Sequence, residues 1–288
     1  MIIDGHCHPT DYIDAAWRHG GSPFTGERLI KLMDGPFWIC GKKRRVDYGV
    51  IQPPPGNTAW RKGMKGGVEG IRKYMAYYRE LAGKYPDRLI GCFTYNPRFG
   101  VKEGVEEFER HVRENNFRML KVHSNMQAYR PDRAEDWLFP ILAKAEELDV
   151  PVLYHTGDPP YSVPTQFYPG IEKFPNVKHI IGHFGIQTGG SYCFEAAWMT
   201  KKNPNVWVES GWLFQSRLVE FTELIGPEKL LFATDSPPNE PGVWLRFLEV
   251  LTWDYPQGFN LSEEDLEKIM GGNLAKMMKL EANNFKIY

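Results

Sequence analysis

The segment MIIDGHCH (residues 1–8) begins with an apolar run and ends with two histidines that are separated by one residue. Further side chains able to bind metals also follow short apolar runs: His155 follows PVLY, His183 follows HIIG and Asp235 follows LLFAT. A parallel β-barrel gathers the carboxyl ends of its strands at one mouth, so ligands scattered along the chain would converge there. Imidazoles and a carboxylate form a donor set that suits zinc or a similar divalent ion. The pattern predicts a metal-dependent enzyme built on a barrel.

Short β-type runs alternate with longer helical patterns along the chain. Such alternation indicates βαβ units and a parallel sheet, and eight units favour a closed α/β (β/α)8 TIM barrel over an open sheet. The expected strands cover residues 1–6, 47–52, 88–95, 117–123, 150–155, 177–183, 205–211 and 229–234. The expected helices cover residues 68–84, 101–115, 133–148, 191–202, 214–225 and 243–251.

Extra C-terminal helices and long mouth loops are expected around this barrel. Ser262, with Asp265 three residues later, resembles a capping box that opens a helix, and another helix is expected over residues 273–280. Residues 10–45 contain no clean strand, and residues 53–65 form a long loop after the second strand, where barrel loops shape substrate access. No repeat or linker interrupts the pattern, so we expect a single domain over residues 1–288.

The composition excludes several classes of partner. The formal net charge is −1, which argues against nucleic acid, and the basic run at residues 42–45 is expected to be a solvated loop or rim. The four cysteines form no CxxC pair, which favours a reducing compartment. With no signal-peptide pattern and no long apolar stretch, we expect a cytoplasmic protein without a membrane partner that acts on a small molecule. Barrels of this kind are often dimers, so a homodimer is among the expected assemblies.

Strand alternation predicts which side chains enter the barrel. His6 and His8 share one parity, and Leu120 and Val122 are expected to face the helices, which turns Lys121 and His123 inward. The same reasoning predicts two further inward sets: His179, Ile181 and His183, and Leu231, Ala233 and Asp235. Asp4 shares the parity of His6 but lies lower, where a hydrogen-bonding role is as plausible as a catalytic one, and His179 is expected to be structural.

Several segments together resemble the amidohydrolase superfamily, in particular the amidohydrolase-related group that includes aminocarboxymuconate-semialdehyde and resorcylate decarboxylases. The matching pieces occur in the order of that family and span nearly the whole chain. They are IIDGHCHP (2–9), LKVHS (120–124), PVLYHTGD (151–158), HIIGHFG (179–185), LLFATDSP (230–237) and GGNLAKMMKL (271–280).

The resemblance implies a role for each matching residue. His6, His8 and His155 resemble the histidine ligands of the family, and Asp235 resembles its carboxylate on the eighth strand. His183 resembles the histidine of the sixth strand, which contacts bound water or substrate in one-metal members. A divalent ion would activate water near neutral pH, with Asp235 accepting its proton and His183 orienting the nucleophile or protonating the departing group.

Lys121 leaves two alternatives open. Some members of the superfamily carry a carboxylated lysine at the end of the fourth strand that bridges two metals, whereas the one-metal group has a lysine here without carboxylation. We expect one zinc or other divalent ion per chain, with His123 contacting substrate. Weaker expectations for substrate contact are Gln52, Asn96, Arg61, Arg130 and Glu209, with Trp60 and Trp212 as an apolar wall.

Three functions are compatible with this pattern. The leading expectation is metal-dependent hydrolysis of a C–N or C–O bond in a small molecule. The alternative is non-oxidative decarboxylation of an aromatic or enol-type acid, which a carboxylate-clamping arginine and an apolar slot would favour. A barrel that has kept its fold and lost its chemistry is a third hypothesis, and the full set of competent ligands argues against it.

Overall fold

Eight parallel strands form the centre of the computed structural model, which describes residues 1–11, 22–53, 68–187 and 190–280. Each strand pairs with the next one along the barrel, in the order β1-β4-β5-β6-β7-β8-β11-β12. All eight expected strands are therefore present. They are β1 (Ile3–Cys7), β4 (Tyr48–Ile51), β5 (Leu89–Thr94), β6 (Phe117–Val122), β7 (Val152–Tyr154), β8 (His179–Ile181), β11 (Val206–Glu209) and β12 (Leu230–Leu231).

The first and last strands meet and close the barrel. The backbone N–H of Gly5 donates to the carbonyl of Phe232 at 3.0 Å, and that of His8 donates to the carbonyl of Ser236 at 2.8 Å. A parallel bridge joins Cys7 to Ser236 just beyond the end of β12. The two chain segments that carry His6 and Asp235 are consequently neighbours, although they lie at opposite ends of the sequence.

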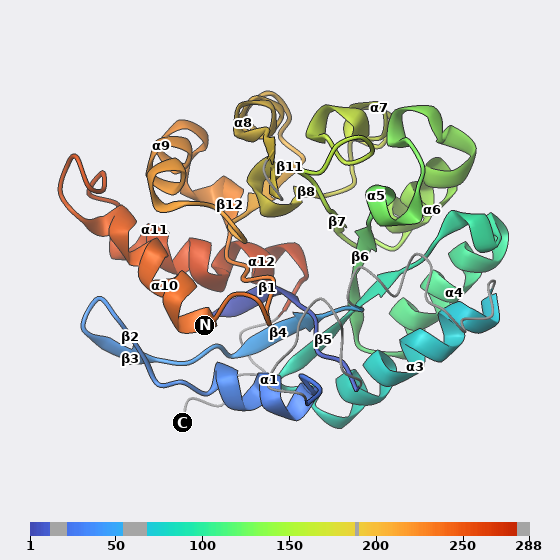
Figure 1. Cartoon of the computed structure of the whole chain (residues 1–288), viewed down its shortest axis with the longest axis horizontal. Coiled ribbons are helices and arrows are strands. Elements are labelled where there is room, and N and C mark those ends of the chain that lie inside the picture. Colours follow the sequence, from blue (N-terminus) through green and yellow to red (C-terminus); the bar gives the residue numbers. More distant parts are fainter. Residues whose placement is uncertain (12–21, 54–67, 188–189, 281–288) are drawn as a thin grey trace.

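Helices surround the strands on the outside of the barrel (Figure 1), as a (β/α)8 TIM barrel requires. All six expected inter-strand helices form, with ends that differ from the expected ones by a few residues. The helices are α1 (Gly26–Met33), α3 (Val68–Lys84), α4 (Val101–Glu114), α5 (Ser124–Gln127), α6 (Glu135–Glu147), α7 (Tyr168–Lys173), α8 (Cys193–Lys202), α9 (Gln215–Ile225), α10 (Pro241–Glu249), α11 (Glu263–Glu267) and α12 (Asn273–Met277). No helix among these described segments is both long and apolar enough to cross a bilayer.

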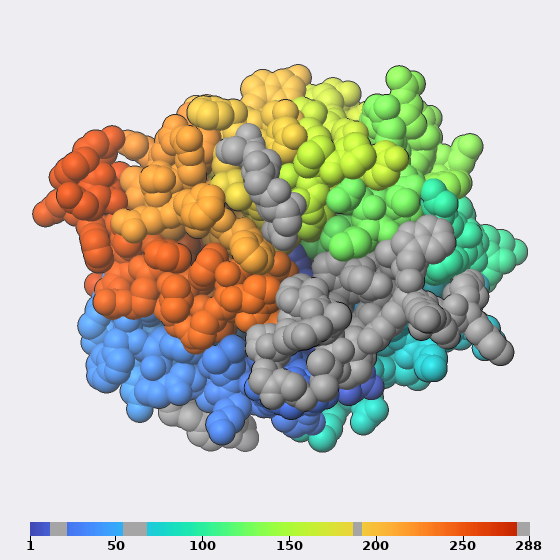
Figure 2. Space-filling view, viewed as in Figure 1, coloured from blue at the N-terminus to red at the C-terminus, as the bar shows by residue number. Residues whose placement is uncertain are grey.

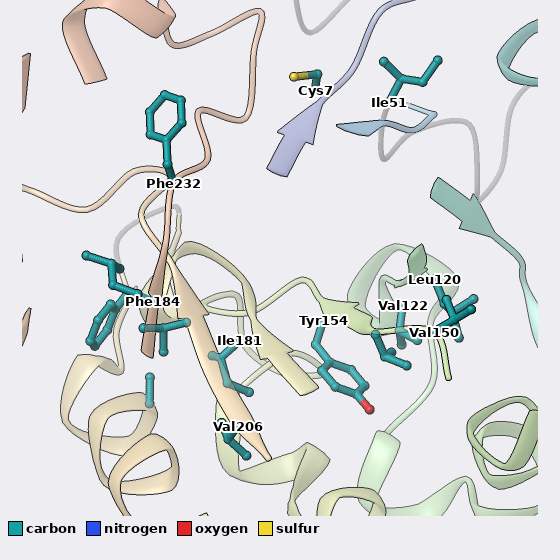
Figure 3. Close-up of a cluster of buried hydrophobic side chains, with 14 of the residues drawn as sticks. Cys7, Ile51, Leu120, Val122, Val150, Tyr154, Ile181, Phe184, Val206 and Phe232 are labelled. Carbon is teal, nitrogen blue, oxygen red and sulfur yellow. The ribbon is translucent and has the colours of Figure 1, made fainter. Parts of the chain in front are cut away.

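Two apolar layers hold the barrel together. The inner layer takes side chains from all eight strands and continues onto α12, which packs against β1 and β12. The outer layer lies between the strands and the surrounding helices, and Figure 3 shows part of it, including Val122, Tyr154 and Ile181. The strand side chains of the inner layer are Ile3, Tyr48, Val50, Ile90, Cys92, Met119, Leu153, Ile180, Trp207 and Leu231.

These layers correct one prediction about side-chain direction. Ile180 lies in the inner layer and Ile181 in the outer one, so His179 and Ile181 do not face the lumen as alternation had predicted. Strand β1 also departs from simple alternation, because its register with β4 shifts between Asp4 and Cys7. A bulge of this kind changes the direction in which the side chains that follow it point.

The basic run at residues 42–45 is not a loop. Residues Lys42–Arg44 form strand β3, which pairs antiparallel with β2 (Phe37–Ile39) in a hairpin. Lys42 forms an ion pair with Glu263, and Arg44 forms one with Glu267, both on the acidic helix α11. The positive charges therefore attach the hairpin to the C-terminal part of the fold, where the expected cap by Ser262 is present: its hydroxyl accepts from the backbone N–H of Asp265.

Candidate metal centre

Three side chains from the first and last barrel strands converge on one point. Nε2 of His6 lies 3.0 Å from Nε2 of His8 and 3.2 Å from Oδ1 of Asp235. Nε2 of His8 lies 2.9 Å from the same Asp235 oxygen. All three residues are at most 5% exposed. In Figure 2 the N-terminal, middle and C-terminal parts of the chain meet around the centre of one face.

The hydrogen bonds of the two histidines leave these Nε2 atoms without protons. Nδ1 of His8 lies 2.9 Å from the carbonyl of Pro53 and 3.2 Å from that of Gln52, so this nitrogen must carry the proton. Nδ1 of His6 lies 3.2 Å from Oε1 of Glu209 and donates in the same way. Burial and the charge of Lys121 hold the pKa of His6 well below its ordinary value, which keeps the ring neutral.

Two bare imidazole nitrogens and a carboxylate oxygen therefore face one another without a hydrogen between them. The ammonium group of Lys121 lies 3.2 Å from Nε2 of His6 and offsets part of the repulsion between these acceptors, and a divalent metal ion held by all three fits the donor set. His183 belongs to the same group, because His6, His183 and Asp235 each offer one ligand atom within 4.8 Å of the others.

Asp235 reaches this point through an unusual backbone. Its φ of 61° lies in the left-handed region, which few residues other than glycine adopt. The neighbouring Thr234 fixes the turn, because its N–H and hydroxyl both donate to the buried carboxylate of Asp4, at 2.9 and 2.6 Å. Asp4 thus has the structural hydrogen-bonding role that was one of its two alternatives. The second oxygen of Asp235 accepts from the indole N–H of Trp212 at 2.6 Å.

His155 lies beside His183 and not among the three converging residues. Its Nδ1 is 3.1 Å from Nε2 of His183, and its Nε2 is 2.7 Å from Oδ2 of Asp158. The Asp158 carboxylate holds the Nε2 proton, which leaves Nδ1 as the nitrogen that faces the site. Burial lowers the pKa of both His155 and His183 well below the ordinary value.

His183 enters the site by a turn that follows β8. The turn η4 (Gly182–Gly185) gives His183 a φ of 56° and Phe184 a φ of 50°. The backbone N–H of His183 donates to Oε1 of Glu209 at 2.6 Å, and its ring Nδ1 lies 3.3 Å from the same oxygen. Glu209 therefore contacts both His6 and His183. Burial raises the pKa of its carboxyl group, opposed by the two backbone N–H groups that it accepts.

Lys121 points into the site from β6, as alternation predicted. Its Nζ lies 3.2 Å from Nε2 of His6, and the side chain is 4% exposed. Burial lowers the pKa of its ammonium group, while the carboxylates of Asp235 and Glu209 oppose that shift. In the described part of the chain, Lys121 is the only lysine or arginine that is buried.

The comparisons with known proteins agree with this geometry. The model of the amidohydrolase family matches residues 3–280. The chain belongs to the amidohydrolase family. Curated proteins give no sequence match to this chain.

Solved structures similar to this amidohydrolase share its fold at low identity. A dihydroxybenzoic acid decarboxylase from Polaromonas sp. JS666, with bound manganese and the inhibitor 2-nitroresorcinol, is 20% identical with a TM-score of 0.69, and 99% of each chain is covered. A 5-carboxyvanillate decarboxylase from Sphingomonas paucimobilis is 15% identical with a TM-score of 0.69, covering 97% of this chain and 99% of that one. The corresponding enzyme from Novosphingobium aromaticivorans, with manganese and 4-hydroxy-3-methoxy-5-nitrobenzoic acid, is 17% identical with a TM-score of 0.68, covering 96% and 95%.

The other predicted site residues of this amidohydrolase lie in varied places. Gln52 and His123 are buried just beyond the ends of β4 and β6. Asn96 caps the turn η1 (Pro97–Phe99), because its side chain accepts from the N–H of Arg98. Arg130 is half exposed and makes two hydrogen bonds to Asp132, at 2.7 and 3.2 Å. Arg61 and Trp60 lie outside the described residues.

Sequence reasoning missed two contacts in this amidohydrolase. It did not single out Asp158 as the hydrogen-bond partner of His155, although the two residues are only three positions apart. It considered Trp212 only as an apolar wall, whereas its N–H donates to Asp235. The second contact depends on strands β11 and β12 lying side by side, which the order of residues alone does not show.

Proposed function

We propose that this amidohydrolase is a metal-dependent decarboxylase that acts on an aromatic or enol-type carboxylic acid. The observation that carries the proposal is the position of Lys121, the one buried cationic side chain among the described residues, beside the converging acceptors. An anionic carboxylate held next to a metal ion gains from a second positive charge in a site of low dielectric. The decarboxylases among the structures of the same fold support this reading.

The chain offers a complete set of ligands for the metal. His6, His8 and Asp235 would hold the ion, with His155 completing the set, and the carbonyl and carboxylate partners of the histidines fix their orientation. When bound, a divalent ion supplies a Lewis acid that orients the carboxylate and a neighbouring oxygen of the substrate. Zinc suits the nitrogen and oxygen donors, and the similar decarboxylases bind manganese, so the identity of the ion is part of the test.

The residues around the metal position can carry out the proton transfer. Decarboxylation breaks the bond between the carboxylate carbon and the substrate carbon, the electron pair stays on the substrate carbon, and that carbon takes up one proton as carbon dioxide leaves. His183 is the proposed donor, because its ring Nδ1 lies 3.3 Å from Oε1 of Glu209, a carboxyl group whose pKa is raised by burial and which can return a proton to the ring. Lys121 would hold the carboxylate, and the indole N–H of Trp212, which donates to the second oxygen of Asp235, would fix the direction of that side chain.

Hydrolysis, the leading expectation from the sequence, rests on membership of the family alone. The same acceptors could serve it, with Asp235 taking a proton from water. A buried ammonium group would stabilise the oxyanion that forms when a neutral amide or ester is hydrolysed, but only an acid substrate also carries a negative charge for it to bind before the reaction begins. Decarboxylation therefore explains more of this site.

The experiment tests two matched panels of compounds as substrates of the protein, which is loaded with either manganese or zinc. One panel contains hydroxybenzoates, including 2,6-dihydroxybenzoate and 5-carboxyvanillate, with carbon dioxide release and product followed by chromatography. The other contains amides, esters and lactones of similar size. The expected result is turnover of at least one acid, which is lost in the His6→Ala/His8→Ala variant. Turnover confined to the second panel would establish hydrolysis instead.

A further inference from the structure

Gln52 has an unusual position for a polar side chain. It is 0% exposed, and within the described chain neither Oε1 nor Nε2 of its amide has a hydrogen-bond partner. A buried amide gives up its hydrogen bonds to water on folding, and leaving both of its ends unpaired destabilises the folded protein. Such a group calls for an explanation other than packing.

Strand alternation directs the amide of Gln52 toward the mouth of the barrel. Tyr48 and Val50 belong to the inner layer and Ile51 to the outer one, so alternation places Gln52 on the inner side. Its backbone is fixed next to the metal centre, because its N–H donates to the carbonyl of Cys7 at 3.0 Å and its own carbonyl lies 3.2 Å from Nδ1 of His8. The side chain is therefore held at the level of the histidine ligands.

His123 follows a strand two positions further around the barrel, and its ring is also buried and on the inner side. Met119 belongs to the inner layer, and Lys121 points to His6, so His123 shares the inward parity of both. Its Nδ1 accepts from the backbone N–H of Met126 at 3.4 Å, which places the proton on Nε2. That Nε2 is buried and has no partner within the described residues. The ring stacks on His155 with centroids 3.8 Å apart and an interplanar angle of 12°, so its direction is fixed.

The two groups belong to the part of the mouth that the metal ligands do not use. The candidate ligands come from the first, fifth, sixth and eighth strands of the barrel, whereas Gln52 and His123 follow the second and fourth strands, β4 and β6. Asn96, which follows the strand between them, uses its side-chain oxygen to cap a turn. Gln52 and His123 thus offer three unpaired polar atoms on this arc: two donors and an acceptor.

We propose that Gln52 and His123 form a polar subsite that binds a hydroxyl group of the substrate. A hydroxyl oxygen can accept from Nε2 of either residue, and its hydrogen can be donated to Oε1 of Gln52, so one group satisfies both ends of the amide. An ether oxygen in the same place could accept a hydrogen bond from Nε2 but has no hydrogen to donate to Oε1 of Gln52. The inference rests on the proposed function, because it assumes an acid bound at the metal centre, and it adds that this acid carries a hydroxyl group on the side of β4 and β6.

The test compares Gln52→Leu with the wild type in two measurements. Gln52→Leu replaces an unpaired buried amide with an apolar side chain of similar size, so it should raise the Tm of the metal-free protein by about 2 °C. Titration calorimetry of the metal-loaded protein should show that the wild type binds 2,6-dihydroxybenzoate at least about tenfold more tightly than 2,6-dimethoxybenzoate, and that the variant discriminates by less than about threefold. His123→Phe, which keeps an aromatic ring against His155, should also reduce the preference.

Thr222→Val is the matched control. Thr222 lies on α9, and its hydroxyl is also buried without a hydrogen-bond partner within the described residues. This variant should raise the Tm in the same way and leave the hydroxyl preference unchanged. A lower Tm for Gln52→Leu, an unchanged preference, or no binding of the hydroxy acid to the wild type would overturn the inference. Binding with the expected preference but without release of carbon dioxide would overturn the proposed function and leave the subsite standing.

Discussion

Oε1 of Glu209 lies 3.2 Å from Nδ1 of His6 and thereby determines which nitrogen of His6 faces the metal position. The same carboxylate accepts the backbone N–H groups of His183 and Gly211, both at 2.6 Å. One side chain from β11 therefore orients a residue of β1 and fixes the turn after β8. Glu209 does not belong to the group of converging ligand atoms, but the orientation of His6 and His183 in that group depends on it.

Glu209→Gln should weaken metal binding about 10- to 100-fold without unfolding the protein. An amide has one acceptor oxygen, so it cannot accept at both oxygens as Glu209 does, and it lacks the charge that favours the proton on Nδ1 of His6. The measurement is competitive titration of the metal with a chelator. Glu107→Gln, which changes a buried carboxylate paired with Arg72 on the outside of the barrel, should leave the affinity unchanged. Equal affinities for the two variants would contradict the role of Glu209.

His6→Ala/His8→Ala should abolish binding of the metal. The double variant removes two of the three converging side chains and leaves Asp235, with His183 nearby, as too few ligands to hold the ion. Plasma mass spectrometry of gently purified protein should give about one equivalent per chain for the wild type and none for the variant. His111→Gln, a change to a buried histidine on α4 away from the mouth, should retain the metal. Retention of metal by the double variant would place the ion elsewhere.

Lys121→Met should reduce kcat/KM for an acid substrate at least about 100-fold while the protein keeps its metal. The variant preserves the length of the buried side chain and removes the positive charge that the proposal assigns to the carboxylate. Steady-state kinetics and metal content are measured on the same preparation. A fall from about two metal equivalents to one would show instead that Lys121 bridges two ions, which is the alternative that the sequence left open.

The strand ends and the polar side chains that follow them could be predicted from sequence because they depend on local patterns. An apolar run followed by a histidine or aspartate identifies the carboxyl end of a barrel strand, whatever the rest of the chain does. Alternation worked for Lys121 and Glu209, which point inward from regular strands.

Alternation failed on β8, where Ile180 and not Ile181 lies in the inner layer, and it does not explain how the residues after the strands reach the site. His183 and Asp235 both reach the site through left-handed turns, with φ of 56° and 61°, and nothing in a count of every second residue anticipates such turns. The contact between His6 and Glu209 joins residues 203 positions apart. It depends on the closure of the whole barrel, so the roles of such orienting residues are visible only in the structure.

Two helical glycines should respond in opposite directions to replacement by alanine. A Cβ on Gly104 of α4 would lie 1.9 Å from the ring of buried Tyr95, so Gly104→Ala should lower the free energy of unfolding by about 2 kcal/mol. A Cβ on Gly83 of α3 would meet nothing within 4 Å, so Gly83→Ala should raise it by up to about 1 kcal/mol through helix propensity. Urea denaturation measures both. Destabilisation by both variants would show that α3 is packed more tightly at Gly83 than the structure indicates.

The stability of the metal-free protein should fall on acidification, in part because of His179. This residue is 0% exposed, with Nδ1 2.7 Å from the hydroxyl of Tyr154 and Nε2 3.0 Å from the carbonyl of Phe174. Burial lowers its pKa from 6.5 to about 4, against the opposing effect of that carbonyl. Between these two values the unfolded chain binds a proton that the folded protein does not, so stability is lost as the pH falls through this window.

His179→Gln isolates this contribution, because glutamine can accept from Tyr154 and donate to Phe174 without titrating. The loss assigned to His179 between pH 7 and 4 is at most about 3 kcal/mol, and the variant should show a decline smaller by about that amount in urea denaturation at each pH. The buried histidines of the metal centre add losses of the same sign, whereas Asp4, whose pKa burial raises to about 6, acts in the opposite direction in both proteins. Those contributions cancel in the comparison. Parallel curves for the variant and the wild type would mean that His179 takes up its proton in the folded state and that the Tyr154 and Phe174 contacts rearrange to accept it.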